Sequence, residues 1–231
     1  MMRRKMILAR IKLVPPLPPA LGQAMRLLRE DPNVDMGRLA ELLRYDPAIT
    51  ANLLRLANSP LFGATQRIGN LRDALVRVGA DRLSQFLLAL GVAPRLRSEV
   101  KGYDLPPEAL LEHSMAVAVA AELVAAHCGL EPPPHAFTAG LLADIGKLVL
   151  GQFLEIDGRG IVALAEAEGL SFEEAERRVL AIDHLEVGAA LLEEWGVPGE
   201  IVDVVRHRLS PDACPRPSLA LDLVHAGDTV A

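Results

Sequence analysis

Residues 137–150 read Phe-Thr-Ala-Gly-Leu-Leu-Ala-Asp-Ile-Gly-Lys-Leu-Val-Leu, and they contain the carboxylate on which the functional prediction depends. Leu141, Asp144 and Leu148 follow one another at helical spacing, so a helix would place them on one face. An unpaired charge inside an apolar stripe is costly, and Gly146 is a poor residue for a helix interior. Asp144 therefore needs a partner. The sequence leaves four kinds open: a metal ion, a histidine, a lysine, or the backbone amides of a new turn.

The composition is that of a globular protein. Of its 231 residues, 51% are hydrophobic and 23% are charged, enough for one large domain or two small ones. We expect no membrane span, because no apolar run reaches about 18–20 residues, and no export signal, because Arg10 and Lys12 interrupt the N-terminal apolar run. Cys128 and Cys214 show no metal or redox spacing, which favours a reducing compartment and predicts a cytoplasmic protein.

The charge is unevenly distributed along the chain. Residues 1–100 carry 16 basic and 8 acidic side chains, whereas residues 101–231 carry 8 basic and 22 acidic ones. The asymmetry suggests two halves with different partners, or halves that attract each other. Solvated helix faces of opposite sign would produce the same pattern.

Nearly every segment shows helical periodicity, and no convincing alternating strand is present, so the predicted fold class is all-α. The predicted division is an N-terminal extension at residues 1–16, a small helical subdomain at residues 17–100 and a second helical subdomain at residues 101–231, packed on the first. Five short helices are expected in the first subdomain. In the second, a long helix is expected from about Glu108 to His127. Residues typical of helix N-caps are Asp35, Asp46, Asn70, Ser171, Asp183 and Ser218.

Several potential metal ligands lie on different predicted helices, each among apolar neighbours: His113, Asp144, His184, His207 and Asp228. Imidazole and carboxylate are ligands for Zn, Fe, Mn or Mg. A metal with a bound water could hydrolyse phosphate esters. Any one of these histidines alone is more often a satisfied core residue than a ligand, and sequence spacing cannot bring the five together.

The chain resembles the HDOD (HD-related output domain) family of bacterial signalling proteins over roughly residues 17–231. The motifs that carry the resemblance are Asp46-Pro47, Leu56-Ala57-Asn58-Ser59, Phe62-Gly63, residues 74–79, His113-Ser114, residues 139–147, residues 183–188 and Trp195-Gly196-Val197-Pro198. The resemblance implies a second half related to HD phosphohydrolases and HD-GYP cyclic-dinucleotide phosphodiesterases, preceded by an added helical half.

The HD pattern of a histidine, a His-Asp pair and a distant aspartate falls on His113, Ala143-Asp144 and Asp228. The histidine of the pair is therefore an alanine in this chain. The further histidines of HD-GYP proteins fall on His184 and His207, but the histidine that would follow directly is Arg208. Each side of a two-metal site would thus lose one ligand. The three remaining ligands that could hold a single divalent ion are His113, Asp144 and Asp228. Further candidates near the site are Lys147, Glu186 and Arg208.

These departures favour a non-catalytic regulatory module without a cofactor, in which the remaining polar residues form a hydrogen-bonded core. The resemblance implies that signalling proteins are its partners, and a cyclic dinucleotide could be a ligand. A second copy could also pack against the small-residue face at residues 116–126. The enzymatic alternative is a metal-dependent phosphohydrolase or cyclic-dinucleotide phosphodiesterase with a reduced metal site.

A third class is a DNA-binding protein. Residues 36–58 are predicted to form a helix, a short turn and a second helix, and the first half of the chain is basic. Because helical pairs are common in bundles and no Lys/Arg stripe follows the second helix, nucleic-acid binding is the least favoured hypothesis. The chain ends three residues after Asp228, within a predicted helix, so a longer C-terminal segment stays open.

Overall fold

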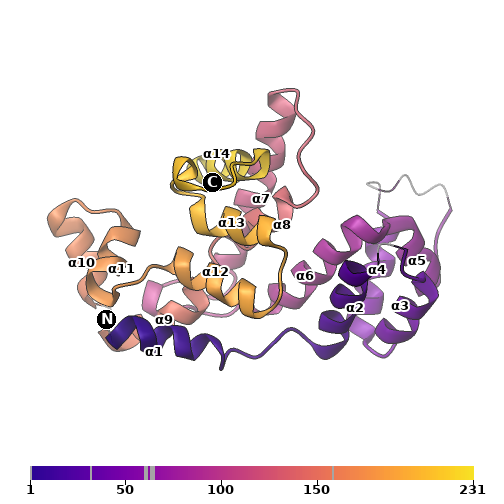
Figure 1. The fold of residues 1–231 in the computed structure, drawn as a ribbon, viewed down its shortest axis with the longest axis horizontal. Helices are drawn as coiled ribbons and strands as arrows, with labels where there is room; N and C mark the ends of the chain where they lie inside the picture. The colour runs from indigo at the N-terminus through magenta and orange to yellow at the C-terminus, as the bar shows by residue number, and fades with distance from the viewer. Residues whose placement is uncertain (1, 32, 60–61, 63–65, 158) are drawn as a thin grey trace. The chain divides into compact units, whose positions relative to one another are not determined.

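The computed structural model describes residues 2–31, 33–59, 62, 66–157 and 159–231, and over these residues it contains helices and no strand (Figure 1). The predicted all-α fold is confirmed. The chain divides into two compact units, one formed by residues 16–92 and the other by residues 1–15 together with residues 93–231. The motif residue Gly63 falls outside the described residues.

The unit at residues 16–92 is a bundle of short helices around its own apolar core. Its helices are α2 (Pro19–Glu30), α3 (Met36–Leu43), α4 (Pro47–Ala57), α5 (Leu71–Val78) and the first part of α6 (Ala80–Leu96). Fully buried leucines from all five of these helices meet in the core: Leu21, Leu39, Leu53, Leu75 and Leu87 are examples. The five predicted helices are therefore present.

Local capping explains where several of these helices begin. The carboxylate of Asp46 accepts hydrogen bonds from the backbone N–H groups of Ala48 and Ile49, at 2.9 and 3.0 Å, and Pro47 occupies the first helical position. Asp35 and Asn70 accept equivalent bonds at the starts of α3 and α5. A short polar side chain before each apolar stripe thus fixes the helix start.

The second unit carries the predicted site residues. It contains α1 (Met2–Ile11), α7 (Ala109–His127), α8 (Ala136–Leu141), α9 (Lys147–Asp157), α10 (Arg159–Glu168), α11 (Phe172–Leu180), α12 (His184–Glu194), α13 (Gly199–His207) and α14 (Leu219–Val230), with short 3-10 turns at Lys101–Tyr103 and Pro211–Ala213. Ser171 and Glu174 form the predicted capping box of α11. Ser218 caps α14 as expected.

The long helix α7 packs against α8 and α14. By length and composition alone, α7 is apolar enough to cross a membrane, which the sequence analysis did not expect. It also carries Glu112, His113 and Glu122, and its buried residues include Ala118 and Ala121. Of its most apolar 18-residue stretch, 33% is buried, and Met115, Val119 and Leu123 stay exposed. Core packing against two helices therefore accounts for only part of its apolar composition.

The prediction of one continuous helix through Asp144 is wrong. Helix α8 ends at Leu141, turns follow, and α9 begins at Lys147. Gly146 lies so close to α12 that a Cβ atom there would be 1.9 Å from the carbonyl oxygen of His184. The helix break places Asp144 in the turns, and Gly146 allows these turns to approach α12 directly.

Two helices lack a counterpart in the sequence prediction. Helix α1 lies within the region predicted only as an extension, and it packs against α12 and α9 through buried Ile7 and Ile11. Helix α10 packs against α11. Both helices are only ten residues long, which makes their periodicity weak.

Candidate functional site

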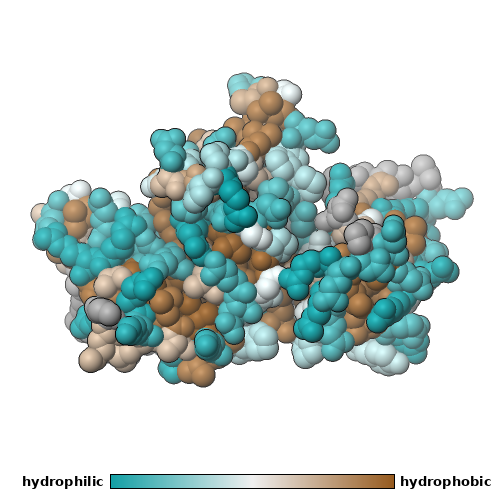
Figure 2. Space-filling view, viewed as in Figure 1, coloured by the Kyte–Doolittle hydropathy of each residue, from teal (hydrophilic) through white to brown (hydrophobic). Residues whose placement is uncertain are grey.

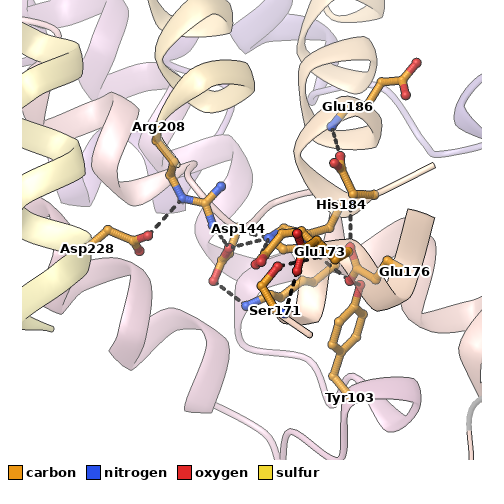
Figure 3. A network of polar contacts seen from close by, with 12 residues as sticks. Tyr103, Asp144, Ser171, Glu173, Glu176, His184, Glu186, Arg208 and Asp228 are labelled. Carbon is orange, nitrogen blue, oxygen red and sulfur yellow. Dashed lines mark hydrogen bonds and ion pairs between the residues drawn. The ribbon is translucent and has the colours of Figure 1, made fainter. Parts of the chain in front are cut away.

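Asp144 is almost completely buried, with a relative exposure of 1%, and two cationic side chains hold its carboxylate. The ammonium nitrogen of Lys147 donates a hydrogen bond of 2.7 Å to Oδ2. The guanidinium of Arg208, which is itself buried, donates to Oδ1 from Nη2 (Figure 3). Lys147 comes from the first turn of α9 and Arg208 from the end of α13, so two elements converge on the turns after α8.

A second carboxylate approaches Arg208 from α14. Oδ2 of Asp228 lies 3.4 Å from Nε of Arg208, while Oδ1 lies 3.7 Å from Nε2 of His113. The same His113 nitrogen lies 3.5 Å from Oδ2 of Asp144. The guanidinium and the His113 imidazole thus both lie between the two aspartates. The His113 side chain is 39% exposed, so this edge of the cluster meets solvent.

His184 connects Asp144 to a further buried carboxylate. Its Nε2 lies 3.3 Å from Oδ1 of Asp144, and its Nδ1 lies 2.9 Å from Oε2 of Glu176. Since an ionised carboxylate only accepts hydrogen bonds, Nδ1 donates to Glu176. Glu176 also accepts from the backbone N–H of His184, at 2.8 Å, and from the hydroxyl of Tyr103, at 2.5 Å. The imidazole is therefore oriented from both sides.

The charges of these groups shift their pKa values. Burial alone would raise the pKa of Asp144, but Arg208, Lys147 and His184 outweigh burial and hold this pKa well below its usual range. Burial would lower the pKa of His184, but its hydrogen bonds with Asp144 and Glu176 raise it. For Asp228, burial is again outweighed, by His113 and Arg208, and the pKa is lowered. The aspartates of the cluster are therefore ionised at neutral pH.

The structure brings together most of the predicted site residues. Those within the cluster are His113, Asp144, Lys147, His184, Arg208 and Asp228. His207 lies at the C-terminal end of α13, and no ion pair among the described residues joins it to Asp144. Glu186 instead pairs with Arg4 of α1. Of the four partners left open for Asp144, lysine and histidine are present, and arginine is added.

Sequence reasoning missed Tyr103 and Glu176. Tyr103 lies in the 3-10 turn at Lys101–Tyr103, before the long helix α7. Glu176 lies on α11, where the sequence analysis singled out only the N-cap residue Ser171. The two side chains are 73 residues apart in sequence. Glu176 is fully buried within an otherwise polar helix, and its position at the centre of the inward-facing stripe was the only signal available.

Ala143 lies immediately before the buried aspartate. Its methyl group is 1% exposed and offers no ligand atom. Ala143 thus contributes an apolar contact to the core, and the cluster receives its positive charge from Arg208 and Lys147.

Several proteins of known structure share this fold. A putative phosphohydrolase from Shewanella amazonensis is similar to 97% of this chain and 79% of that chain, with 27% sequence identity and a TM-score of 0.75. A putative signal transduction protein from Marinobacter aquaeolei is 25% identical, with a TM-score of 0.64, over 92% of this chain and 48% of that chain.

Among curated proteins, the cyclic di-GMP phosphodiesterase CdgJ of Vibrio cholerae is 31% identical over 155 residues, which are 63% of this chain and 34% of CdgJ. The chain spans between 16% and 39% of the lengths of the first curated relatives it matches. The family model of the HDOD domain matches residues 14–211, which include the unit at residues 16–92 and every member of the cluster except Asp228. The chain therefore belongs to the HDOD domain family.

Proposed function

We propose that this chain is a non-catalytic signalling module, which acts through contacts with other proteins and uses the HD-type fold as a scaffold. The observation that carries the proposal is the position of Arg208, whose guanidinium contacts Asp144 and lies 3.4 Å from Asp228. In an HD-type hydrolase a metal ion would supply the positive charge between such carboxylates. Here a fixed side chain supplies it, and a guanidinium cannot activate a bound water as a metal does.

The donor set supports the same proposal. Both oxygens of Asp144 accept hydrogen bonds from cationic side chains, and the charges of Arg208 and Lys147 balance those of Asp144 and Asp228. A divalent ion at this place would have to lie beside two fixed positive charges, which like-charge repulsion disfavours. No group of three or more His, Cys, Asp or Glu side chains in the described ranges has an arrangement suited to a metal ion. These residues do not fit the metal that the fold family implies.

A direct test compares wild type with the double variant Ala143→His/Arg208→His, which returns an imidazole to both altered positions. We expect Mn²⁺ or Zn²⁺ to leave the melting temperature of wild type unchanged, because the ion gains no site. The ions should raise the melting temperature of the double variant, since a ligand that binds only the folded state stabilises it. Metal content after gel filtration provides a second measurement.

The enzymatic alternative rests on two observations. His113, which is partly exposed, lies 3.5 Å from Asp144 and 3.7 Å from Asp228, and the chain is similar to a phosphodiesterase. Turnover of a generic phosphodiester or of cyclic di-GMP by wild type, abolished by Asp144→Asn, would sink the non-catalytic proposal. Asp222→Asn is the matched control, because Asp222 is an exposed carboxylate in the first turn of α14.

A further inference from the structure

Helix α1 has two faces with different environments. The inner face packs on residues 93–231 of the second unit, called the HD-like unit below, through Ile7 and Ile11, which are 1% and 4% exposed. Arg4 pairs with Glu186 of α12, and Nη1 of Arg3 donates a 3.2 Å hydrogen bond to the carbonyl of Val179. These contacts fix one side of the helix, so its opposite side faces outward.

The outward side carries an apolar ridge. Met2 and Met6 are 80% and 59% exposed, and Leu13, in the turn that follows the helix, is 68% exposed. Ala9 is exposed as well. At 3.6 residues per turn, Met2, Met6 and Ala9 fall within an arc of about 60°. Two large unbranched side chains thus project from the side that has no packing partner within the unit.

Basic residues border this ridge on both sides. On the helical wheel, Lys5 and Arg10 lie about 70° to either side of the ridge, and Lys12 lies next to Lys5. All three are exposed, and no ion pair with an acidic side chain is found for them in the described part of the chain. Figure 2 shows hydrophobic and hydrophilic side chains adjoining along the edge where Figure 1 places α1. Arg4 therefore neutralises an acidic side chain of its own unit. Lys5, Arg10 and Lys12 have no such partner in the described part of the chain, so their charges are available to an external partner.

We propose that the outer face of α1 binds the surface of an anionic lipid bilayer. An apolar ridge flanked by Lys and Arg is the arrangement in which apolar side chains enter the boundary below the headgroups while cationic ends reach the lipid phosphates. Helix α1 has ten residues, too few to span a bilayer, so it lies in the plane of the surface.

Charge and shape favour a bilayer over an acidic protein. The cations lie on both sides of a convex ridge, which matches an extended anionic plane, whereas a protein partner would need a groove lined with acid on two walls. The rest of the HD-like unit is acidic, since residues 101–231 carry 22 acidic and 8 basic side chains. Repulsion turns that part away from anionic lipid and leaves α1 as the contacting element.

This inference is independent of the absence or presence of catalysis at Asp144. The family match begins at residue 14, after α1. Helix α1 is thus an addition to the part of the chain that the family model describes, and it would place the signalling module at a membrane surface.

Co-sedimentation with vesicles tests the proposal on the full chain. We expect binding to vesicles of equal parts phosphatidylglycerol and phosphatidylcholine, weaker binding as salt rises, and none to phosphatidylcholine alone. Each basic residue near an anionic surface contributes about 1 kcal/mol, or roughly fivefold. The triple variant Lys5→Gln/Arg10→Gln/Lys12→Gln should therefore weaken binding by about two orders of magnitude. The separate double variant Met2→Ser/Met6→Ser should also weaken binding, although it leaves the charge unchanged.

Met115→Ser is the control, since Met115 is an exposed methionine on α7 and not on α1. Equal binding to neutral and anionic vesicles, or full binding by the triple variant, would overturn the proposal. So would the absence of vesicle binding together with capture of polyglutamate that the triple variant loses, because that outcome assigns the face to an acidic protein. All substituted positions are exposed, so unchanged melting temperatures are expected for every variant.

Discussion

Arg208 connects three members of the cluster, because its guanidinium contacts Asp144 and approaches both His184 and Asp228. Its backbone carbonyl also lies 2.5 Å from Nδ1 of His225 on α14. A buried charge pair need not stabilise a fold relative to an apolar pair, but removing one partner leaves the other uncompensated.

Arg208→Met should therefore destabilise the protein. The methionine keeps much of the stem volume but removes the charge, and the loss expected for one partner of a buried pair is about 3–5 kcal/mol. The lower part of that range is expected because Lys147 and His184 still contact Asp144. Urea unfolding followed by circular dichroism measures the change.

The control for that measurement is Arg206→Met, two residues earlier. Arg206 pairs with Glu193 at 2.6 Å, with side chains that are 39% and 55% exposed. Because exposed pairs contribute little, the expected loss is below about 1 kcal/mol. Equal losses for the two variants would mean that Arg208 does not neutralise a buried charge.

At the residue scale, the sequence predicted most members of the cluster but not which of them contact each other. Asp144 was expected to need a partner, and Lys147 was among the candidates. Arg208 was predicted only as a further candidate near the site, because its contact with Asp144 spans 64 residues and depends on how α13 ends. Local periodicity contains no such information.

At the element scale, the break between α8 and α9 depends on Gly146. A methyl group at this position would meet the carbonyl oxygen of His184 at 1.9 Å and the amide nitrogen of Gly188 at 2.6 Å. Both contacts are with backbone of α12, which cannot rotate away. Gly146→Ala should therefore separate the Asp144 turns from α12 and lower the free energy of unfolding by several kcal/mol, of the order known for overpacking.

Gly22→Ala is the matched control for that change. Gly22 is in α2, and a Cβ atom there meets nothing within 4 Å. An alanine in an open helical position should stabilise the protein by about 0.5–1 kcal/mol. If both alanine variants behaved alike in urea unfolding, the close contact at Gly146 would have no energetic weight.

The start of α8 predicts a dependence on pH. His135, at the N-cap position, is partly buried, and its Nε2 has no hydrogen-bond partner among the described residues. Burial lowers the pKa of His135 from its usual value near 6.5, although Glu200 acts in the opposite direction. Between the two pKa values, His135 is protonated in the unfolded chain but neutral in the folded chain. The free energy of unfolding therefore falls as the pH drops from the pKa of His135 in the unfolded chain towards its pKa in the folded chain.

The difference between wild type and His135→Gln measures this effect. The two proteins are expected to differ least above the unfolded pKa, and wild type should lose stability relative to the variant as the solution is acidified. Urea unfolding at a series of pH values provides the comparison. A difference that is independent of pH would show that His135 titrates alike in both states.

Helix starts were predicted well because they depend on nearby residues. Asp35, Asp46, Asn70, Ser171 and Ser218 each cap the expected helix. The predicted helix through Asp144 failed because Gly146 packs directly against the backbone of α12, which lies about forty residues further along the chain. Helix α1 was missed because its two buried isoleucines are set among basic residues.

At the scale of the whole molecule, the two units have separate apolar cores. The core of residues 16–92 is continuous from Leu21 to Leu87 and draws on five helices. We expect the segment Pro16–Leu96, which keeps α6 intact, to fold alone, because a unit with its own buried core can do so. Its helical circular dichroism should disappear in one cooperative urea transition; a gradual loss would count against autonomy.

Glycines determine how closely two helices approach α7: α8, which leads into the turns that hold Asp144, and α14, which carries Asp228. At Gly140 of α8, a Cβ atom would lie 2.8 Å from Cα of Ala118, and at Gly227, next to Asp228, it would lie 2.8 Å from both the nitrogen of Ala121 and the carbonyl oxygen of Val117. Main chain therefore touches main chain at both places. The distances between the polar groups of the cluster therefore depend on the lack of a Cβ atom at Gly140 and Gly227. An alanine at either position, although neither glycine is charged, would move its helix away from α7 and widen the distances between the charged side chains.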